Sequence, residues 1–281
     1  MTTQLPVEMD LERVLLEKQR LEREKDDFVS MLSHDMKNPL TAVIGSIDII
    51  REGRLGPVNE EQVEYLHAAI DSCNEVIAMI DNLLGIHRFK AGRMQIKIAE
   101  YDAVDMLRTV ARRFTRIAGH VGVKLKERFS HDTPKIAVDK NVFSRVIDNL
   151  LANAVKFTPE GGEIVISCRC LKGAEIAWAR LPAYVTLPDG FVEQGCFARV
   201  GIRNTGGGFT DDDLGRIFER QIQSRNGAGR ECGVSGLGLA FCKMAVEGCG
   251  GGIWMESEAG AGCEFITLLP CFANNTECSG Q

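Results

Sequence analysis

A regular apolar spacing between residues 66 and 84 constrains the fold more than any other feature of the sequence. Its members are separated by four, three, four, three and four residues: Leu66, Ile70, Cys73, Ile77, Ile80 and Leu84. This is the a/d spacing of a helix that packs along a seam. Since one such helix cannot cover its own seam, the sequence predicts a helical hairpin whose two copies pair as a dimeric four-helix bundle.

The segment before this seam predicts the partner helix of the hairpin. Residues 9–52 are rich in Leu, Glu, Lys, Arg and Ile and contain no glycine before Gly45, which favours one long helix. Residues 1–27 carry only a partial heptad, so we expect at most a short, imperfect coiled coil there. The string GRLGPVN, residues 53–59, has two glycines and one proline and predicts the turn into the second helix.

After Gly92 the pattern changes to short strands that alternate with helices. The predicted strands are Met94–Ile98, Val123–Phe129, Glu163–Cys170, Phe197–Arg203, Ile253–Glu258 and Cys263–Leu269. The predicted helices are Val104–Ala118, Asn141–Phe157, Asp212–Phe218 and Leu237–Glu247. The chain is therefore predicted to be α+β, with an N-terminal helix at 1–27, a helical hairpin at 28–91, a strand-containing domain at 92–272 and a tail at 273–281.

Composition narrows the class of protein and the partners. The chain has 281 residues, and its formal net charge of -6 gives no electrostatic reason to expect nucleic-acid binding. We find no apolar run long enough to cross a bilayer and no signal-peptide pattern at the start, which predicts a cytoplasmic protein without a membrane span. The 10 cysteines are accordingly expected to be mostly reduced thiols.

The string FVSMLSHDMKNPLTAVIG, residues 28–45, carries the most informative polar residues of the predicted hairpin. Helical geometry places His34 and Asn38 one turn apart on the same face, with Asp35 beside the imidazole. A neutral imidazole attacks a phosphoryl group only when one nitrogen is unprotonated, and a carboxylate that accepts the proton of the other nitrogen fixes this tautomer. Pro39 removes a backbone hydrogen bond and is expected to loosen the helix just after His34.

A second constellation lies on the predicted helix at 141–157, in the string DNLLANAVKFTPEGG. Asn149 and Asn153 are one turn apart and Lys156 is three residues further, so the three side chains can line one side of the helix. Amide oxygens suit Mg²⁺, and a lysine suits phosphate oxygens.

Two glycine clusters follow. The string RNTGGGF, residues 203–209, ends a predicted strand and lets backbone approach a planar base closely. Gly236 and Gly238 open a predicted helix, whose unpaired N–H groups attract phosphate. The polar stretch between them, Gln221–Cys232, has the composition of a mobile lid. The stretch Leu171–Cys196 is expected to be a long hairpin excursion.

These strings together resemble the motifs of bacterial two-component sensor histidine kinases over about residues 10–270. SHDMKNPL is similar to the family's H box, and DNLLANAVKFTPEGG to its N box. RNTGGGF resembles the G1 box, IFE at 217–219 the F box, and the segment with Gly236 and Gly238 the G2 box, all in the family's order. The resemblance implies an α/β sandwich ATP-binding domain of the Bergerat (histidine kinase) type. It implies that Asn153 ligates Mg²⁺ and that ATP contacts a set of residues in the four downstream boxes: Asn149, Asn153, Lys156, Asn204, Gly206, Gly208, Phe218, Gly236, Leu237 and Gly238.

The resemblance also implies a reaction. His34 would be phosphorylated from Mg-ATP and would pass the phosphoryl group to an aspartate of a response-regulator receiver domain. Asn38 matches the position from which family members orient a water that dephosphorylates the regulator. The input could reach the N-terminal helix from a separate sensor protein or from an upstream domain.

Three departures from the family pattern support an alternative. Asn204 stands where the family has an aspartate that accepts a hydrogen bond from adenine, Gln221 where a second phenylalanine is frequent, and Val234 where a glycine is common. Because a neutral amide accepts without charge assistance, adenine binding should be weaker or less selective. The alternative is a degenerate kinase that acts as a dimeric nucleotide-binding scaffold. A topoisomerase-type ATPase would account for the second domain only.

Overall fold

The computed structural model describes two compact units, Met1–Met94 and Gln95–Gln281, each of which is considered by itself. The described residues are 5–130, 135–172, 175, 181, 182, 185, 196–209, 214, 217, 218, 236–258 and 260–271. The proposed lid at 221–232, most of the helix expected at 212–218, most of the 171–196 excursion and the 273–281 tail lie outside them. No helix among the described residues is both long and apolar enough to span a bilayer.

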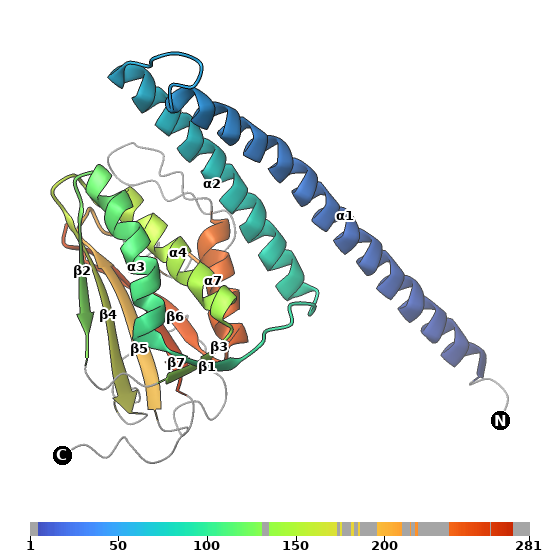
Figure 1. The fold of residues 1–281 in the computed structure, drawn as a ribbon. Helices are drawn as coiled ribbons and strands as arrows, with labels where there is room; N and C mark the ends of the chain where they lie inside the picture. The colour runs from blue at the N-terminus through green and yellow to red at the C-terminus, as the bar shows by residue number, and fades with distance from the viewer. Residues whose placement is uncertain are drawn as a thin grey trace. The chain divides into compact units, whose positions relative to one another are not determined.

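The first unit is the predicted helical hairpin (Figure 1). Helix α1 spans Leu5–Arg51 and α2 spans Glu60–Lys90. Asn59 caps α2, because its side chain accepts from the Gln62 backbone N–H while the Gln62 side chain accepts from the Asn59 N–H. All members of the 66–84 seam are buried or half-buried between mostly exposed neighbours. The seam therefore packs as the spacing predicts.

Pro39 lies within α1, which runs unbroken through it. The expected loosening after His34 is thus not visible as a break in the helix. The chain leaves α1 where Gly53 takes a φ of 72°, a left-handed conformation that glycine adopts without strain.

The second unit is a sheet covered by helices on one face (Figure 1). Within the described residues, its main sheet has five strands in the order β2-β4-β5-β7-β6, of which only the β2–β4 pair is parallel. These strands are β2 Lys124–Phe129, β4 Glu163–Lys172, β5 Cys196–Asn204, β6 Gly252–Glu258 and β7 Gly262–Pro270. A separate two-stranded sheet pairs β1 Ala99–Asp102 with β3 Lys135–Val138.

In the part of the unit that the structure describes, three helices form the covering layer: α3 Ala103–His120, α4 Lys140–Phe157 and α7 Leu237–Gly248. Asp102 and Asp139 cap α3 and α4 by accepting from backbone N–H groups of their first turns. Along α4, one stripe is buried toward the sheet: Val142, Phe143, Val146, Ile147, Leu150, Leu151 and Ala154. This stripe fixes the rotation of α4, and therefore the direction in which its polar face points.

The strand predicted at Met94–Ile98 is wrong. Residues 94–98 form no strand, and β1 begins one residue later, at Ala99. Its partner β3, which the sequence pattern did not predict, faces it in a register that begins at Ala99 opposite Val138. Residues before this register have no partner strand, although the Lys97 N–H donates to the Asp139 carboxylate at 2.9 Å. The start of β1 is therefore set by its pairing with β3, which the alternation of apolar residues does not reveal.

Candidate functional site

His34 projects from α1 into solvent, with 75% of its side chain exposed. Its Nδ1 lies 3.2 Å from the Asn38 amide nitrogen and 3.6 Å from an Asp35 carboxylate oxygen. Both neighbours therefore face the same ring nitrogen, which leaves Nε2 directed away from them. The preceding residue, Ser33, is buried and its hydroxyl donates to the Val29 carbonyl at 2.8 Å.

This arrangement decides which nitrogen can act as a nucleophile. An amide N–H of Asn38 directed at Nδ1 favours the tautomer protonated at Nε2, whereas attack by Nε2 needs the proton on Nδ1. In the tautomer that carries the proton on Nδ1, the Asp35 carboxylate, 3.6 Å away, is the neighbouring acceptor for that proton. Asp35 and Asn38 thus compete for one nitrogen and set the tautomer between them. A third contact, the ion pair of Lys37 with Asp81, ties α1 to α2 next to this site.

The predicted Asn149, Asn153 and Lys156 lie on α4, outside its buried stripe. Asn149 is half-buried and its amide donates to the Arg145 carbonyl at 3.0 Å. Asn153 is half-buried, and within the described part of the chain no hydrogen bond engages its side chain. Lys156 is exposed. Of the three, Asn153 therefore has the most available oxygen for a hard cation.

Asp148, next to Asn149, is a charged neighbour that the sequence analysis did not select. Burial raises the pKa of its carboxyl group, and the ion pair with Arg113 of α3 opposes this shift. Arg113 therefore places a positive charge beside Asp148, next to the α4 face that carries the asparagines.

Asn204 ends β5 and is almost completely buried, with 3% exposed. Its side-chain oxygen accepts from the Cys263 thiol at 3.0 Å, and its amide nitrogen donates to the Thr205 carbonyl at 3.3 Å. Burial raises the pKa of Cys263 to about 12, so this thiol keeps its proton at neutral pH and remains a donor. The amide is therefore held in one orientation, with its oxygen toward β7.

Cys263 is the residue of this site that the sequence analysis missed. It stands directly opposite Asn204 in the β5–β7 register. The only signal in the sequence was its position after the glycines at 260 and 262. A cysteine there packs like any small core residue, so only the strand pairing reveals its contact with Asn204.

The glycines after Asn204 are required by close backbone contacts. A Cβ at Gly206 would lie 2.8 Å from the Phe157 carbonyl oxygen at the end of α4. Gly208 has a φ of 72°, and a Cβ there would lie 2.6 Å from the Glu258 carbonyl oxygen. The loop after β5 is thereby brought against the C-terminal end of α4, which joins two of the predicted motifs.

The remaining predicted residues lie at the edges of this arrangement. Phe218 is buried and meets Phe265 of β7 edge-on, with ring centroids 6.5 Å apart. Gly236 is the N-cap of α7, and no side chain caps this end of the helix. The backbone N–H groups of Leu237 and Gly238, in the first turn, therefore receive no acceptor from the cap residue. Helix α7 packs on α4, where Arg145 covers the Phe241 ring at 3.9 Å.

Two family models match consecutive parts of the chain. Residues 24–92 match the His Kinase A (phospho-acceptor) domain, and residues 138–272 match the histidine kinase-, DNA gyrase B- and HSP90-like ATPase. His34 and Asn38 fall within the first match, and all predicted nucleotide-site residues fall within the second.

Three known proteins illustrate the similarity. The alginate biosynthesis sensor protein KinB of Pseudomonas aeruginosa is 28% identical over 92% of this chain and 39% of its own length. The histidine protein kinase DivJ of Caulobacter vibrioides is 25% identical over 92% of this chain and 40% of its own. The crystal structure of full-length ShkA in complex with AMPPNP matches with a TM-score of 0.60 at 25% identity, covering 88% of this chain and 46% of that one.

The chain spans about two-fifths of the length of these curated relatives. Within that span it carries a phospho-acceptor hairpin followed by an ATPase-type sheet domain. The chain belongs to the bacterial two-component sensor histidine kinases.

Proposed function

We propose that this chain is an ATP-dependent histidine kinase that phosphorylates its own His34 and transfers the phosphoryl group to an aspartate of a response-regulator receiver domain. The observation that carries the proposal is the exposed His34 imidazole, whose Nδ1 faces Asp35 and Asn38 while Nε2 is left open to solvent. A histidine kept for packing would be buried. With its proton on Nδ1, this imidazole presents the Nε2 lone pair to an incoming phosphoryl group.

In the proposed reaction, the Nε2 lone pair of His34 forms a bond to the γ-phosphorus as the bond to the β–γ bridging oxygen breaks. Asp35 accepts a hydrogen bond from Nδ1–H and stabilises the positive charge that develops on the ring. The transferred group then leaves Nε2 for a receiver aspartate. Positioning and charge neutralisation supply most of the catalysis in such transfers.

The α4 face fits a magnesium nucleotide. Asn153 has an unengaged amide oxygen among the described residues, and Mg²⁺ is normally held by few protein oxygens, completing its shell with phosphates and water. Asn153 would hold the ion, which would neutralise phosphate charge, with Asn149 and Lys156 on the same face near the phosphates. The AMPPNP complex of the ShkA relative supports ATP as the nucleotide.

A homodimer in the cytoplasm completes the proposal. Several large apolar side chains of α1 and α2 are exposed in the single hairpin: Met31, Leu32, Met36, Val43, Ile49, Ile50, Val76 and Leu83. A second hairpin would cover such side chains and so form the four-helix bundle that the 66–84 seam predicts.

Incubation of the purified chain with Mg²⁺ and γ-labelled ATP tests the kinase function directly. The label should appear on the protein as an acid-labile, base-stable phosphoramidate and should move to a receiver domain added later. A degenerate scaffold would bind nucleotide and dimerise without taking up label. Failure to label in the presence of demonstrated ATP binding would therefore favour the scaffold.

Asn204 provides a prediction about nucleotide affinity. We expect Asn204→Asp to bind an ATP analogue roughly tenfold more tightly, because a carboxylate accepts a stronger hydrogen bond from the adenine amino group than an amide does. The nucleotide-free variant should be less stable, since the carboxylate would be buried beside the Cys263 thiol. Calorimetric titration with AMPPNP and with a guanine analogue measures both affinity and selectivity. An unchanged affinity for both analogues would show that residue 204 does not read the base.

Asn38 supports a second activity, dephosphorylation of the regulator. Its amide lies one helical turn from His34 and is exposed, as a group that orients an attacking water must be. Asn38→Ala should slow the dephosphorylation of a phosphorylated receiver domain by roughly tenfold or more, since it removes the orienting hydrogen bond. The matched control is Thr41→Ala, an exposed residue further along α1 whose hydroxyl bonds only to the helix backbone. Equal rates for wild type and Asn38→Ala would exclude this role.

A further inference from the structure

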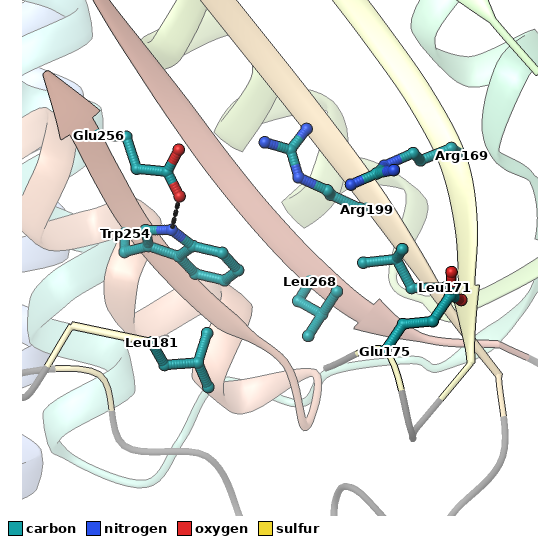
Figure 2. A pocket seen from close by; sticks show the side chains of 8 residues that line it. All are labelled: Arg169, Leu171, Glu175, Leu181, Arg199, Trp254, Glu256 and Leu268. Carbon is teal, nitrogen blue, oxygen red and sulfur yellow. Dashed lines mark hydrogen bonds between the residues drawn. The ribbon is translucent and has the colours of Figure 1, made fainter. Parts of the chain in front are cut away.

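A cavity of about 270 Å³ lies on the sheet of the second unit, away from the nucleotide motifs (Figure 2). Glu127 of β2 forms an ion pair with Arg108 of α3, so its side chain lies on the face of the sheet that the helices cover. Ile166 of β4 is its partner in the β2–β4 register and therefore lies on the same face. Side chains alternate along a strand, so Arg169 and Leu171 of β4 face the other way. The cavity therefore opens on the face opposite the helices.

The floor of this cavity is apolar. Leu171, Trp254 and Leu268 line it and belong to a buried cluster in which every member is at most 9% exposed. Leu181 lines the cavity and packs against the same cluster from outside the sheet. An antiparallel sheet with helices on one face normally presents polar side chains to water on the other. On this face an apolar cluster, packed by Leu181 and Val185, instead lines the cavity.

Positive charge lies at one side of the cavity. Arg169 and Arg199 are direct cross-strand neighbours, a like-charged pairing that costs stability unless anions offset it. Glu264 pairs with Arg199 at 2.9 Å. The Arg199 side chain is only 16% exposed and the Glu264 side chain 23%. For Arg169, no counter-ion is found among the described residues.

Gly201 makes room for the Arg199–Glu264 pair. A Cβ at this mid-strand position would lie 2.2 Å from the Glu264 carboxylate and 3.0 Å from the Arg199 guanidinium. A glycine inside a strand weakens the strand, so its presence here is explained by the ion pair that passes over it. Arg199 is thereby held in one orientation before any ligand arrives.

Negative charge lies at the other side. Glu256 accepts from the Trp254 indole N–H at 3.1 Å, which places a carboxylate beside an aromatic ring. Figure 2 shows the Arg199 guanidinium between Arg169 and this Trp254–Glu256 pair. A carboxylate next to an indole is a favourable environment for an ammonium group, through charge and cation–π attraction.

The cavity lining carries both signs of charge: Arg169 and Arg199 on one side, Glu175 and Glu256 on the other. Glu264 already pairs with Arg199. A simple anion would leave the carboxylates of Glu175 and Glu256 without a cation, and a simple cation would leave Arg169 without an anion. The lining is complementary to a ligand that carries both charges and an apolar side chain.

We propose that this cavity binds a small apolar α-amino acid as a zwitterion. Arg169 and Arg199 take its carboxylate, Glu256 and Trp254 take its ammonium group, and the leucine-lined floor covers its side chain. The site lies within the second unit and its binding does not depend on phosphotransfer by His34.

The test follows the indole N–H signal of Trp254 by ¹H–¹⁵N NMR in the intact 281-residue chain while L-leucine is added. Trp178→Phe leaves this as the single indole signal, because the chain has 2 tryptophans. L-leucinamide lacks the carboxylate and N-acetyl-L-leucine lacks the ammonium group, so each probes one half of the site. We expect leucine to shift the signal saturably and to bind roughly tenfold or more tightly than either analogue.

Two variants assign the charges. Arg169→Gln should weaken leucine binding roughly tenfold and leave leucinamide unaffected, whereas Glu256→Gln should weaken leucine and leave N-acetyl-leucine unaffected. Arg128→Gln is the matched control, an exposed arginine of β2 that does not line the cavity. An unshifted signal at saturating leucine, equal binding of the three compounds, or no effect of Arg169→Gln would overturn the proposal.

Discussion

Replacement of His34 by glutamine should abolish labelling of the chain by γ-labelled ATP, with a loss of roughly 10³-fold or more, because the carboxamide has no lone pair that can form the phosphoramidate bond. The fold should survive, since the His34 side chain is 75% exposed and supports no core contact. Binding of AMPPNP to the second unit should remain at the wild-type level. The measurement is label uptake at matched protein and nucleotide concentrations.

His67→Gln is the control for this substitution. His67 is an exposed histidine on α2, so its replacement removes an imidazole from the same hairpin without touching the proposed acceptor. Label uptake by His67→Gln should equal that of the wild type. If the His34 variant keeps its label, the phospho-acceptor is a different residue and the reading of the H box is wrong.

The second large effect is expected at Gly262, at the start of β7. Its φ is +101°, and a Cβ there would lie 2.0 Å from the Asn204 carbonyl oxygen. Gly262→Ala therefore combines a left-handed conformation with a collision against backbone that cannot move without breaking the β5–β7 ladder. We expect a loss of about 3 kcal/mol or more in the free energy of unfolding of the second unit. Displacement of Asn204 should also weaken nucleotide binding.

Gly260 separates these two causes. It lies in the same turn with a φ of +80°, but a Cβ there would meet no atom within 4 Å. Gly260→Ala should therefore show only the backbone cost, about 1 kcal/mol. Urea unfolding followed by tryptophan fluorescence compares the two variants, since Trp178 and Trp254 both lie in the second unit. Equal stability losses would mean that the loop relaxes around the Gly262 substitution and that the close contact is not decisive.

The H box shows how much of a helical site sequence reasoning can supply. Neighbours on a helix are set by local geometry, so the i, i+4 spacing of His34 and Asn38 predicted that they share one face, where their side chains lie 3.2 Å apart. The same holds for the α4 residues, whose common face follows from the buried stripe of that helix. Spacing does not tell which ring nitrogen the neighbours meet, because that depends on side-chain rotamers.

Strand boundaries were predicted well where the apolar alternation ended at a turn, and poorly where a partner strand set the limit. The predicted limits of β5, β6 and β7 lie within one residue of those observed. The β1–β3 pair was misplaced or missed, because its register depends on two segments more than thirty residues apart, Ala99 and Val138.

The sequence by itself determined the helical hairpin, the order of the main-sheet strands and of α3, α4 and α7 along the chain, and the local clusters around His34, Asn153 and Gly206. These depend on periodicity and on near neighbours, which the chain order already contains. Only the tertiary structure decided that Cys263 holds Asn204, that Gly262 must be glycine, and that Arg169 and Arg199 face an apolar cavity with Glu256. Those contacts join separate strands, and strand pairing is a long-range choice that no single segment encodes.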